Sequence, residues 1–195
     1  TRTISSAASD VYKRQVERID AVAEIIKKAS KKNKIAVVVS AMSGETNRLI
    51  DLANSFGNNP DKREFDALVS TGETISSALL SMALHSKGIK ARSFSASQIA
   101  IRTTSSYSKA KILDVDAKKI LDVLENDTIP IITGFQGITE GGDITTLGRG
   151  GSDTTAVAIA AQINANRCDI YTDVDGIFTT DPDIVSNAKK LDSIT

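Results

Sequence analysis

Residues 145–155 read TTLGRGGSDTT, and residues 156–161 continue as AVAIAA. Glycines surround Arg149, and small, helix-favouring side chains follow. The pattern predicts a glycine-rich loop that opens onto a helix, with Ser152 or Asp153 as its N-cap residue. The free N–H groups and the positive dipole end of a helix start favour an anion, and an arginine fork suits a carboxylate or a phosphate. A plain turn with ordinary capping residues is the alternative interpretation.

On both sides of this loop, short apolar runs alternate with segments whose apolar residues recur at helical spacing. Strands are predicted at 35–40 (IAVVVS) and 129–135 (IPIITGF), both buried on two faces, and at 90–97 and 168–174, with a hairpin at 138–146. Helices are predicted at 16–32, 47–55, 62–85, 116–125 and from the glycine loop to about 166, while 98–108 is ambiguous. The sequence therefore predicts an α/β fold, a three-layer α/β/α sandwich with a mostly parallel sheet. Ligands of such sheets bind at the carboxyl ends of the strands.

The composition of the chain excludes several classes of function. Acidic and basic residues balance at 24 each, so no basic surplus suggests a nucleic-acid partner. No apolar run approaches the roughly 20 residues of a membrane span, and there is no signal-peptide core, so we expect no membrane partner and a cytoplasmic location. Cys168 is the single cysteine, which excludes an internal disulfide. Residues 1–15 are polar and lack periodicity, and we expect a poorly ordered or non-native leader there.

Several polar motifs occur in a fixed order: 40–47 (SAMSGETN), 70–73 (STGE), 134–137 (GFQG), 146–154 (TLGRGGSDT) and 171–176 (YTDVDG). Together, from about residue 16 to residue 195, they closely resemble the aspartate kinases of the amino-acid kinase superfamily. The resemblance implies transfer of the γ-phosphate of ATP, with Mg²⁺, to the side-chain carboxylate of L-aspartate. It also implies a homo-oligomer in the full-length protein and a partial catalytic domain at 16–195 without the regulatory ACT domains.

The residue types suit this reaction, because phosphoryl transfer depends mainly on positioning and on neutralising charge. The acceptor carboxylate needs a cation such as Arg149, and the substrate amino group needs an anion such as Glu73. The resemblance implies substrate-binding roles for Thr46, Glu73, Arg149, Gly150, Gly151 and Ser152, and catalytic roles for Arg149 and Asp153. It implies nucleotide contacts from Ser40, Thr172, Asp173, Phe178, Thr179, Thr180, Asp181, Pro182 and Asp183.

Other interpretations stay open at this point. Glu73 could lie on a solvated helix face, and Asp173 and Asp175 could form a turn before Gly176. An EF-hand is excluded because Ile184 stands where that loop needs its closing glutamate, and no protein metal site is predicted. Cys168 is expected to pack at the start of a buried strand. His85 is expected to be structural or solvated.

The sequence departs from the resemblance in three places. Residues 1–15 lack the opening lysine–glycine phosphate loop, Asp183 replaces an arginine, and the chain stops before a further nucleotide-contacting lysine. We therefore expect little kinase activity from residues 1–195 alone. Two alternatives remain: a superfamily kinase acting on acetylglutamate, glutamate 5-carboxylate or UMP, and a catalytically inactive binding module.

Overall fold

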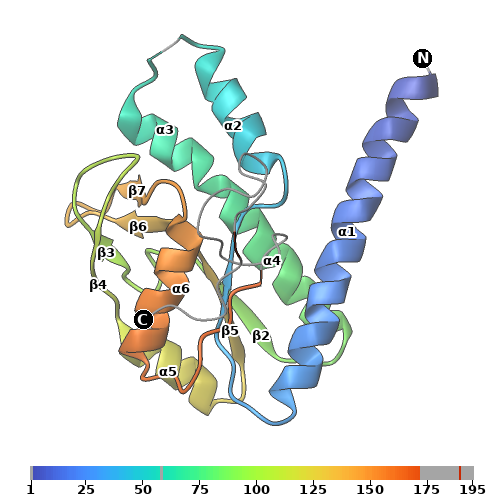
Figure 1. The fold of residues 1–195 in the computed structure, drawn as a ribbon, viewed down its shortest axis with the longest axis vertical. Helices are drawn as coiled ribbons and strands as arrows, with labels where there is room; N and C mark the ends of the chain where they lie inside the picture. Colours follow the sequence, from blue (N-terminus) through green and yellow to red (C-terminus); the bar gives the residue numbers. More distant parts are fainter. Residues whose placement is uncertain (1, 58, 172–188, 190–195) are drawn as a thin grey trace.

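The computed structural model describes residues 2–57, 59–171 and 189, and only the backbone of residues 2–13. Its centre is a three-stranded parallel sheet in the order β1 (Val37–Val39), β5 (Ile129–Thr133), β2 (Ala91–Phe94) (Figure 1). Every residue of β5 is buried, as its apolar run predicted. β1 is only half-buried, and the prediction of burial on both faces was wrong there. The reason is that β1 pairs with β5 alone among the described strands.

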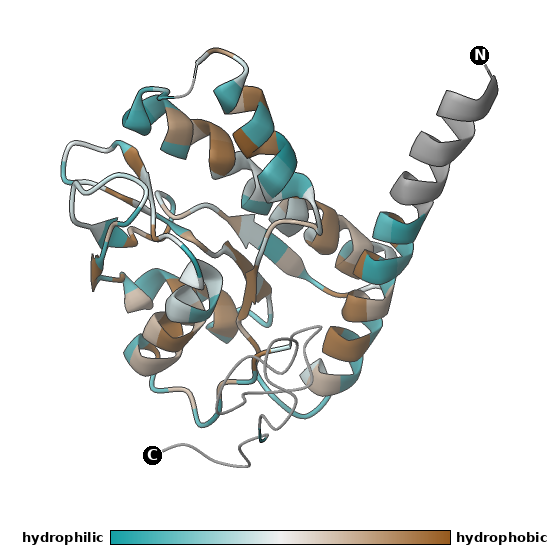
Figure 2. Cartoon of the chain, turned by 45° about the horizontal axis from the view of Figure 1, so that its top comes forward, coloured by the Kyte–Doolittle hydropathy of each residue, from teal (hydrophilic) through white to brown (hydrophobic). Residues whose placement is uncertain are grey.

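Helices cover both faces of this parallel sheet. On one face, α1 (Arg2–Ser30) and α4 (Thr71–Ser86) pack residues such as Ile26 and Leu84 against Ile131 of β5. On the other face, α5 (Ala117–Glu125) and α6 (Gly151–Gln162) pack Ile120 and Ile159 against Ile132. Successive strand residues point to opposite faces, which is why adjacent isoleucines serve two separate cores. The three-layer α/β/α prediction is confirmed, and apolar residues gather at the centre of the molecule (Figure 2).

The first helix starts earlier than the sequence indicated. α1 begins at Arg2, so residues 2–15 are helical in the structure, whereas a poorly ordered or non-native leader was expected. In its second half Ala23 and Ile26 are buried, whereas Val22 and Ile25 are 43% and 45% exposed. Lys87, after the end of α4, fixes α1 by ion pairs to Asp20 at 2.6 Å and to Glu24 at 2.9 Å.

The predicted long helix at 62–85 is divided in two. α3 (Lys62–Val69) starts at Asp61, whose side chain accepts from two first-turn N–H groups, and it ends at Ser70, where α4 begins. The side-chain amide of Gln136 donates to the Ser70 carbonyl at 2.9 Å. A side chain that inserts into the helix hydrogen-bond ladder is a common cause of such a break. α2 (Glu45–Asn54) lies before this pair, close to its predicted position.

The stretch Lys62–Ser86 is, among the described residues, the one long and apolar enough to cross a membrane by length and composition. The sequence does not show this stretch as an apolar run, because serines, threonines and a glycine interrupt it. Half of its apolar window is buried, and α4 packs against α1, β2 and β5. These contacts are those of a core helix.

A second, mixed sheet was only partly predicted. Its order is β4 (Ile112–Asp114), β3 (Arg102–Thr103), β6 (Gln136–Ile138), β7 (Ile144–Thr146). The hairpin β6–β7 confirms the prediction at 138–146, and Gly142 supplies the left-handed residue of its turn at φ +86°. β3 and β4 have two and three residues, which is too short for a sequence period to be recognised.

The predicted strand at 168–174 is not found where the structure describes it. Residues 168–171 form no strand, and residues 172–174 lie outside the described part of the chain. Cys168 is exposed, and Tyr171 is 78% exposed, so the expectation that this cysteine packs in a buried strand was wrong. No described strand lies in register with 168–171 to receive their backbone hydrogen bonds.

Candidate functional site

The polar loops meet at the carboxyl ends of β1 and β5, where open parallel sheets bind ligands (Figure 1). Gly134, directly after β5, donates its N–H to the carbonyl of Val39 at 2.9 Å. A Cβ on Gly134 would lie 2.7 Å from Ser152 Oγ and 2.9 Å from Ser152 Cα. The first turn of α6 therefore packs directly on the end of β5, and only glycine permits that approach.

The loop around Phe135 contacts the start of α6. Phe135 has a left-handed φ of +64°, and its N–H donates to Thr155 Oγ1 at 3.2 Å. Its carbonyl accepts from Leu147 N–H at 2.9 Å. A Cβ on Gly151 would lie 2.8 Å from the Phe135 ring, so the backbone of Gly151 also packs at contact distance. These contacts fix the glycine loop relative to the sheet.

The N-cap of α6 is Gly150, with φ +74°, and no side chain caps the helix. The prediction that Ser152 or Asp153 would be the cap was wrong, and both residues lie in the first turn instead. Glycine at the cap takes the left-handed backbone without strain. A helix start without a side-chain cap leaves N–H donors and the positive dipole end available to an anion. The predicted helix after the glycine loop is confirmed, and it ends at Gln162 rather than 166.

Arg149 precedes this helix start and is exposed. It lies between Gly148 at φ +83° and Gly150 at φ +74°, both in the left-handed region. No described residue forms a hydrogen bond or an ion pair with its guanidinium. Its five N–H donors therefore remain available for an anionic ligand.

Glu73, in the first turn of α4, is 3% exposed, so the alternative of a solvated helix face is wrong. One oxygen of its carboxyl group accepts from the backbone N–H of Ala41 at 3.1 Å. The other, Oε2, is buried without a partner in the described structure. Burial raises the pKa of Glu73 to about 7, against the lowering effect of backbone hydrogen bonds. A cation that reached this carboxylate would satisfy the unpaired oxygen.

The loop between β1 and α2 brings further predicted residues to the same edge. Ser40 is exposed directly after β1, and Thr46 is half-buried in the first turn of α2. This loop touches α4 closely, because a Cβ on Gly72 would lie 2.8 Å from Ala41 Cβ. The other predicted nucleotide residues lie outside the described part of the chain: Thr172, Asp173, Phe178, Thr179, Thr180, Asp181, Pro182 and Asp183.

Asp66 on α3 is a residue of this region that the sequence analysis missed. It is fully buried, and its carboxylate accepts four hydrogen bonds from Ser108 and Thr146. A signal was present in the sequence: within the predicted helix 62–85, Asp66 lies three residues before Val69 and seven before Glu73, which is the spacing of one helix face. An acidic residue on an otherwise buried face requires partners.

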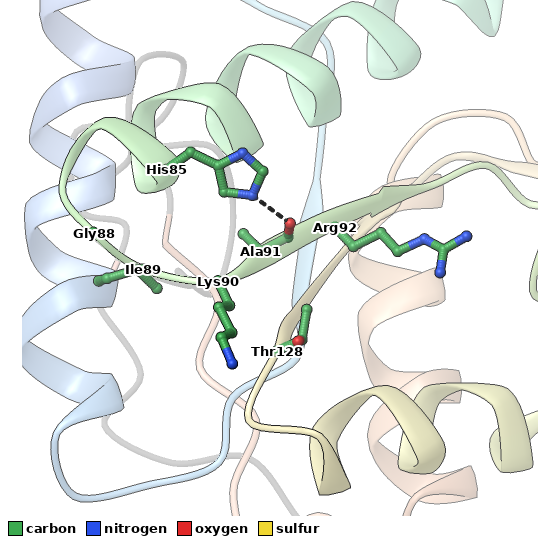
Figure 3. Close-up of a pocket in the computed structure, with 7 residues that line it drawn as sticks. All are labelled: His85, Gly88, Ile89, Lys90, Ala91, Arg92 and Thr128. Carbon is green, nitrogen blue, oxygen red and sulfur yellow. Dashed lines mark hydrogen bonds between the residues drawn. The ribbon is translucent and has the colours of Figure 1, made fainter.

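The hollow in Figure 3 lies elsewhere, at the amino ends of β2 and β5. It measures about 470 Å³ and is lined by residues including Lys90, Arg92 and Thr128. His85 donates from Nε2 to the carbonyl of Ala91 at 2.7 Å, which is the structural role expected of it. Within the described residues no group of three or more His, Cys, Asp or Glu side chains could hold a metal ion.

A parallel α/β sheet with a glycine-flanked arginine at a helix start is typical of α/β domains that bind phosphorylated ligands at the strand ends. The chain belongs to the amino acid kinase family, whose model matches residues 4–195. It is 54% identical over 181 residues to an aspartate kinase of Stutzerimonas stutzeri, covering 92% of this chain and 44% of that protein. An aspartokinase of Pseudomonas aeruginosa is 53% identical over the same shares of the two chains. The chain thus spans less than half the length of the curated relatives it matches.

Solved structures agree with this family. Escherichia coli aspartokinase III in complex with aspartate and ADP superposes with a TM-score of 0.79 at 28% identity, covering 91% of this chain and 51% of that one. The aspartate kinase of Synechocystis gives 0.73 at 45% identity, covering 89% and 29%. An isopentenyl phosphate kinase gives 0.67 at 18% identity, covering 94% and 72%, which shows a shared fold only.

Proposed function

We propose that this chain is part of the catalytic domain of an aspartate kinase, which transfers the γ-phosphate of ATP to the side-chain carboxylate of L-aspartate. The product is 4-phospho-L-aspartate, the first intermediate towards lysine, threonine and methionine. The observation that carries the proposal is the buried, unpaired Oε2 of Glu73, because an amino-acid ammonium group would satisfy it. The high identity to aspartate kinases supports this choice of substrate.

The amino acid is held at both ends in this proposal. Glu73 binds the ammonium group, and Arg149 binds a carboxylate with its planar guanidinium. Thr46 and Ser152 contribute hydroxyl groups, and the backbone of Gly150 and Gly151 allows the substrate to approach closely. The unpaired guanidinium of Arg149 and the uncapped start of α6 support these roles.

The chemical step needs little from protein side chains. A carboxylate oxygen of aspartate attacks the γ-phosphorus of ATP, and the bond between that phosphorus and the bridging oxygen breaks, which leaves ADP. No proton is transferred, because the attacking carboxylate is already an anion. Charge on the transferred group is favoured at the N-terminus of α6, and Asp153 in its first turn organises the site.

ATP and Mg²⁺ complete the proposed site. Ser40 contacts the nucleotide, together with Thr172, Asp173 and residues 178–183. The ion supplies neutralisation of phosphate charge. We further propose that the whole protein acts in the cytoplasm as a homo-oligomer.

Trapping the acyl phosphate with hydroxylamine tests the function. The chain is completed with the flanking segments of the Stutzerimonas stutzeri relative, and this completed chain is assayed with ATP and Mg²⁺. L-aspartate should give hydroxamate, while N-acetylglutamate, L-glutamate and UMP should leave ATP unconsumed. ATP consumption with one of these acceptors but not with aspartate would assign another kinase of the family. ATP binding without any turnover would indicate an inactive binding module.

A further inference from the structure

The carboxylate of Asp66 binds two segments that lie far from it in sequence. Its Oδ2 accepts from the backbone N–H of Ser108 at 2.8 Å and of Thr146 at 2.7 Å. Its Oδ1 accepts from the hydroxyl of Ser108 at 3.0 Å and of Thr146 at 2.9 Å. Both backbone donors and both hydroxyls thus depend on one buried side chain, which is 0% exposed.

Thr146 is the last residue of β7 and lies two residues before Gly148, the first glycine of the loop. It is 1% exposed, and its carbonyl accepts from Ala110 N–H at 2.9 Å. Two residues later, a Cβ on Gly148 would lie 3.3 Å from the carbonyl oxygen of Ser108. Asp66 therefore holds the base of the loop at Thr146, and also the segment against which Gly148 packs.

The same helical pair carries Glu73. Asp66 lies on α3 and Glu73 on α4, and the break between them at Ser70 is bound by the side-chain amide of Gln136. A movement of the loop relative to this pair would change the distance between Arg149 and Glu73. That distance decides whether one amino acid can contact both groups at once.

We propose that Asp66 is a positioning residue for the amino-acid substrate: by fixing Thr146 and Ser108 to α3, it sets the spacing between Arg149 and Glu73. The inference rests on the proposed function of these two residues. Asp66 does not touch the substrate itself, and it acts through the loop that carries Arg149. Its effect should therefore fall on aspartate rather than on ATP.

Two substitutions at Asp66 distinguish the effect of its hydrogen bonds from the effect of its negative charge. In Asp66→Ala all four hydrogen bonds are lost, and two buried N–H groups have no acceptor. In Asp66→Asn the amide oxygen can accept from both N–H groups, and the amide nitrogen can donate to both hydroxyls, since a hydroxyl also accepts. The asparagine variant should therefore keep the loop in place.

Steady-state kinetics of the completed chain test this. In Asp66→Ala the KM for L-aspartate should rise at least tenfold while the KM for ATP stays within twofold, and Asp66→Asn should stay within threefold for both. Arg63→Ala is the matched control, because Arg63 joins α3 to the β6–β7 hairpin through Asp143 at 2.8 Å without contacting Thr146. Equal rises for both substrates, an unchanged aspartate KM in Asp66→Ala, or no rescue by asparagine would overturn the proposal.

Hydrogen exchange gives a readout that does not depend on turnover. Amides of residues 146–150 should exchange at least tenfold faster in Asp66→Ala than in the parent, while amides of α4 keep their rates. If the parent does not phosphorylate aspartate, the proposed function fails, but this measurement still decides whether Asp66 holds the loop. If Asp66→Ala does not fold, Ser108→Ala with Thr146→Val removes both hydroxyl donors, and an unchanged aspartate KM or unchanged exchange at 146–150 there overturns the proposal.

Discussion

The carboxyl group of Glu73 accepts the N–H of Ala41 at 3.1 Å with one oxygen, and its other oxygen is buried without a partner. Ala41 follows β1 and Glu73 lies in the first turn of α4, so this contact joins the strand end to the helix start. A half-satisfied carboxyl group in the interior destabilises the charged form. In the proposed enzyme the substrate ammonium relieves this, so the instability of the empty site favours binding of the correct ligand.

The first prediction is that aspartate binding weakens in acid. Glu73 must be charged to hold an ammonium group, and its pKa is raised to about 7 by burial. The charged fraction therefore falls about tenfold from pH 8 to pH 6, and the KM for aspartate should rise by about the same factor. KM values for aspartate and ATP in the completed chain, measured from pH 5.5 to 8.5, check this. An aspartate KM that is flat across this range, or that changes in parallel with the ATP KM, would contradict it.

The second prediction is that the stability of Glu73→Gln relative to the parent increases as the pH rises. A pKa raised from 4.5 to about 7 means that the folded state binds the proton more tightly than the unfolded state does. The stability cost is therefore absent at low pH, develops as pH rises above the unfolded pKa, and is complete above about pH 7. Relative to the parent, the variant should gain about 2–3 kcal/mol in free energy of unfolding between pH 5 and pH 8.

Urea unfolding of the parent and Glu73→Gln at both pH values measures this difference. The glutamine amide nitrogen replaces the unpaired oxygen and brings its own unsatisfied donor, which adds a pH-independent cost of about 1–3 kcal/mol. For this reason the change with pH, rather than the stability at one pH, is the quantity to compare. A difference between the two proteins that does not vary with pH would show that the pKa of Glu73 is not raised in the folded protein.

The third prediction concerns Arg149→Ala. Loss of a charged partner in a binding site costs about 2–5 kcal/mol, so the KM for aspartate should rise about thirtyfold or more. The free energy of unfolding should change by less than about 0.5 kcal/mol, because the side chain is exposed and has no described partner. Arg102→Ala is the control, since Arg102 is an exposed arginine on β3 that pairs with Asp114. If both variants alter the aspartate KM equally, general electrostatics rather than a specific clamp is responsible.

The sequence predicted β1 and β5 of the parallel sheet well because both strands lie in apolar runs. β5 and α5 lie where periodicity placed them, and Asp116 caps α5 through the N–H of Lys118 at 3.1 Å. The N-cap of α6 was missed because four consecutive residues, from Gly150 to Asp153, are all good capping residues. Gly150 is the cap because of backbone packing: Gly151 contacts Phe135, and Ser152 contacts Gly134. Local preference alone does not contain that information.

The site was predicted less completely than the fold. Motif order indicated Glu73, but its carboxyl group is bound by the N–H of Ala41, which lies 32 residues away, and no local pattern showed that its other oxygen is unpaired. Asp66 bonds to Thr146 across 80 residues, and no local pattern connects the two. Contacts between distant segments are set by the tertiary fold, so a single sequence gives candidate residues without their partners.

The last prediction tests the contact between β5 and α6 through Gly134→Ala. The new Cβ would lie 2.7 Å from Ser152 Oγ and 2.9 Å from Ser152 Cα, and because the second atom is backbone, a rotamer change cannot relieve the clash. The start of α6 must shift, which should lower the free energy of unfolding by about 1–3 kcal/mol. A displacement of about 1 Å at the phosphate end should reduce kcat about a hundredfold.

Gly141→Ala is the matched control for this last substitution. Its Cβ would meet only Thr139 Oγ1, at an ordinary contact distance of 3.7 Å, and its φ is not in the left-handed region. Alanine there should be neutral or should stabilise the protein by about 0.4–1 kcal/mol, because it restricts the unfolded chain. Urea unfolding and hydroxylamine trapping in the completed chain compare the two variants. If Gly134→Ala behaves like Gly141→Ala in both assays, the contact between Gly134 and Ser152 does not hold α6 in its active position.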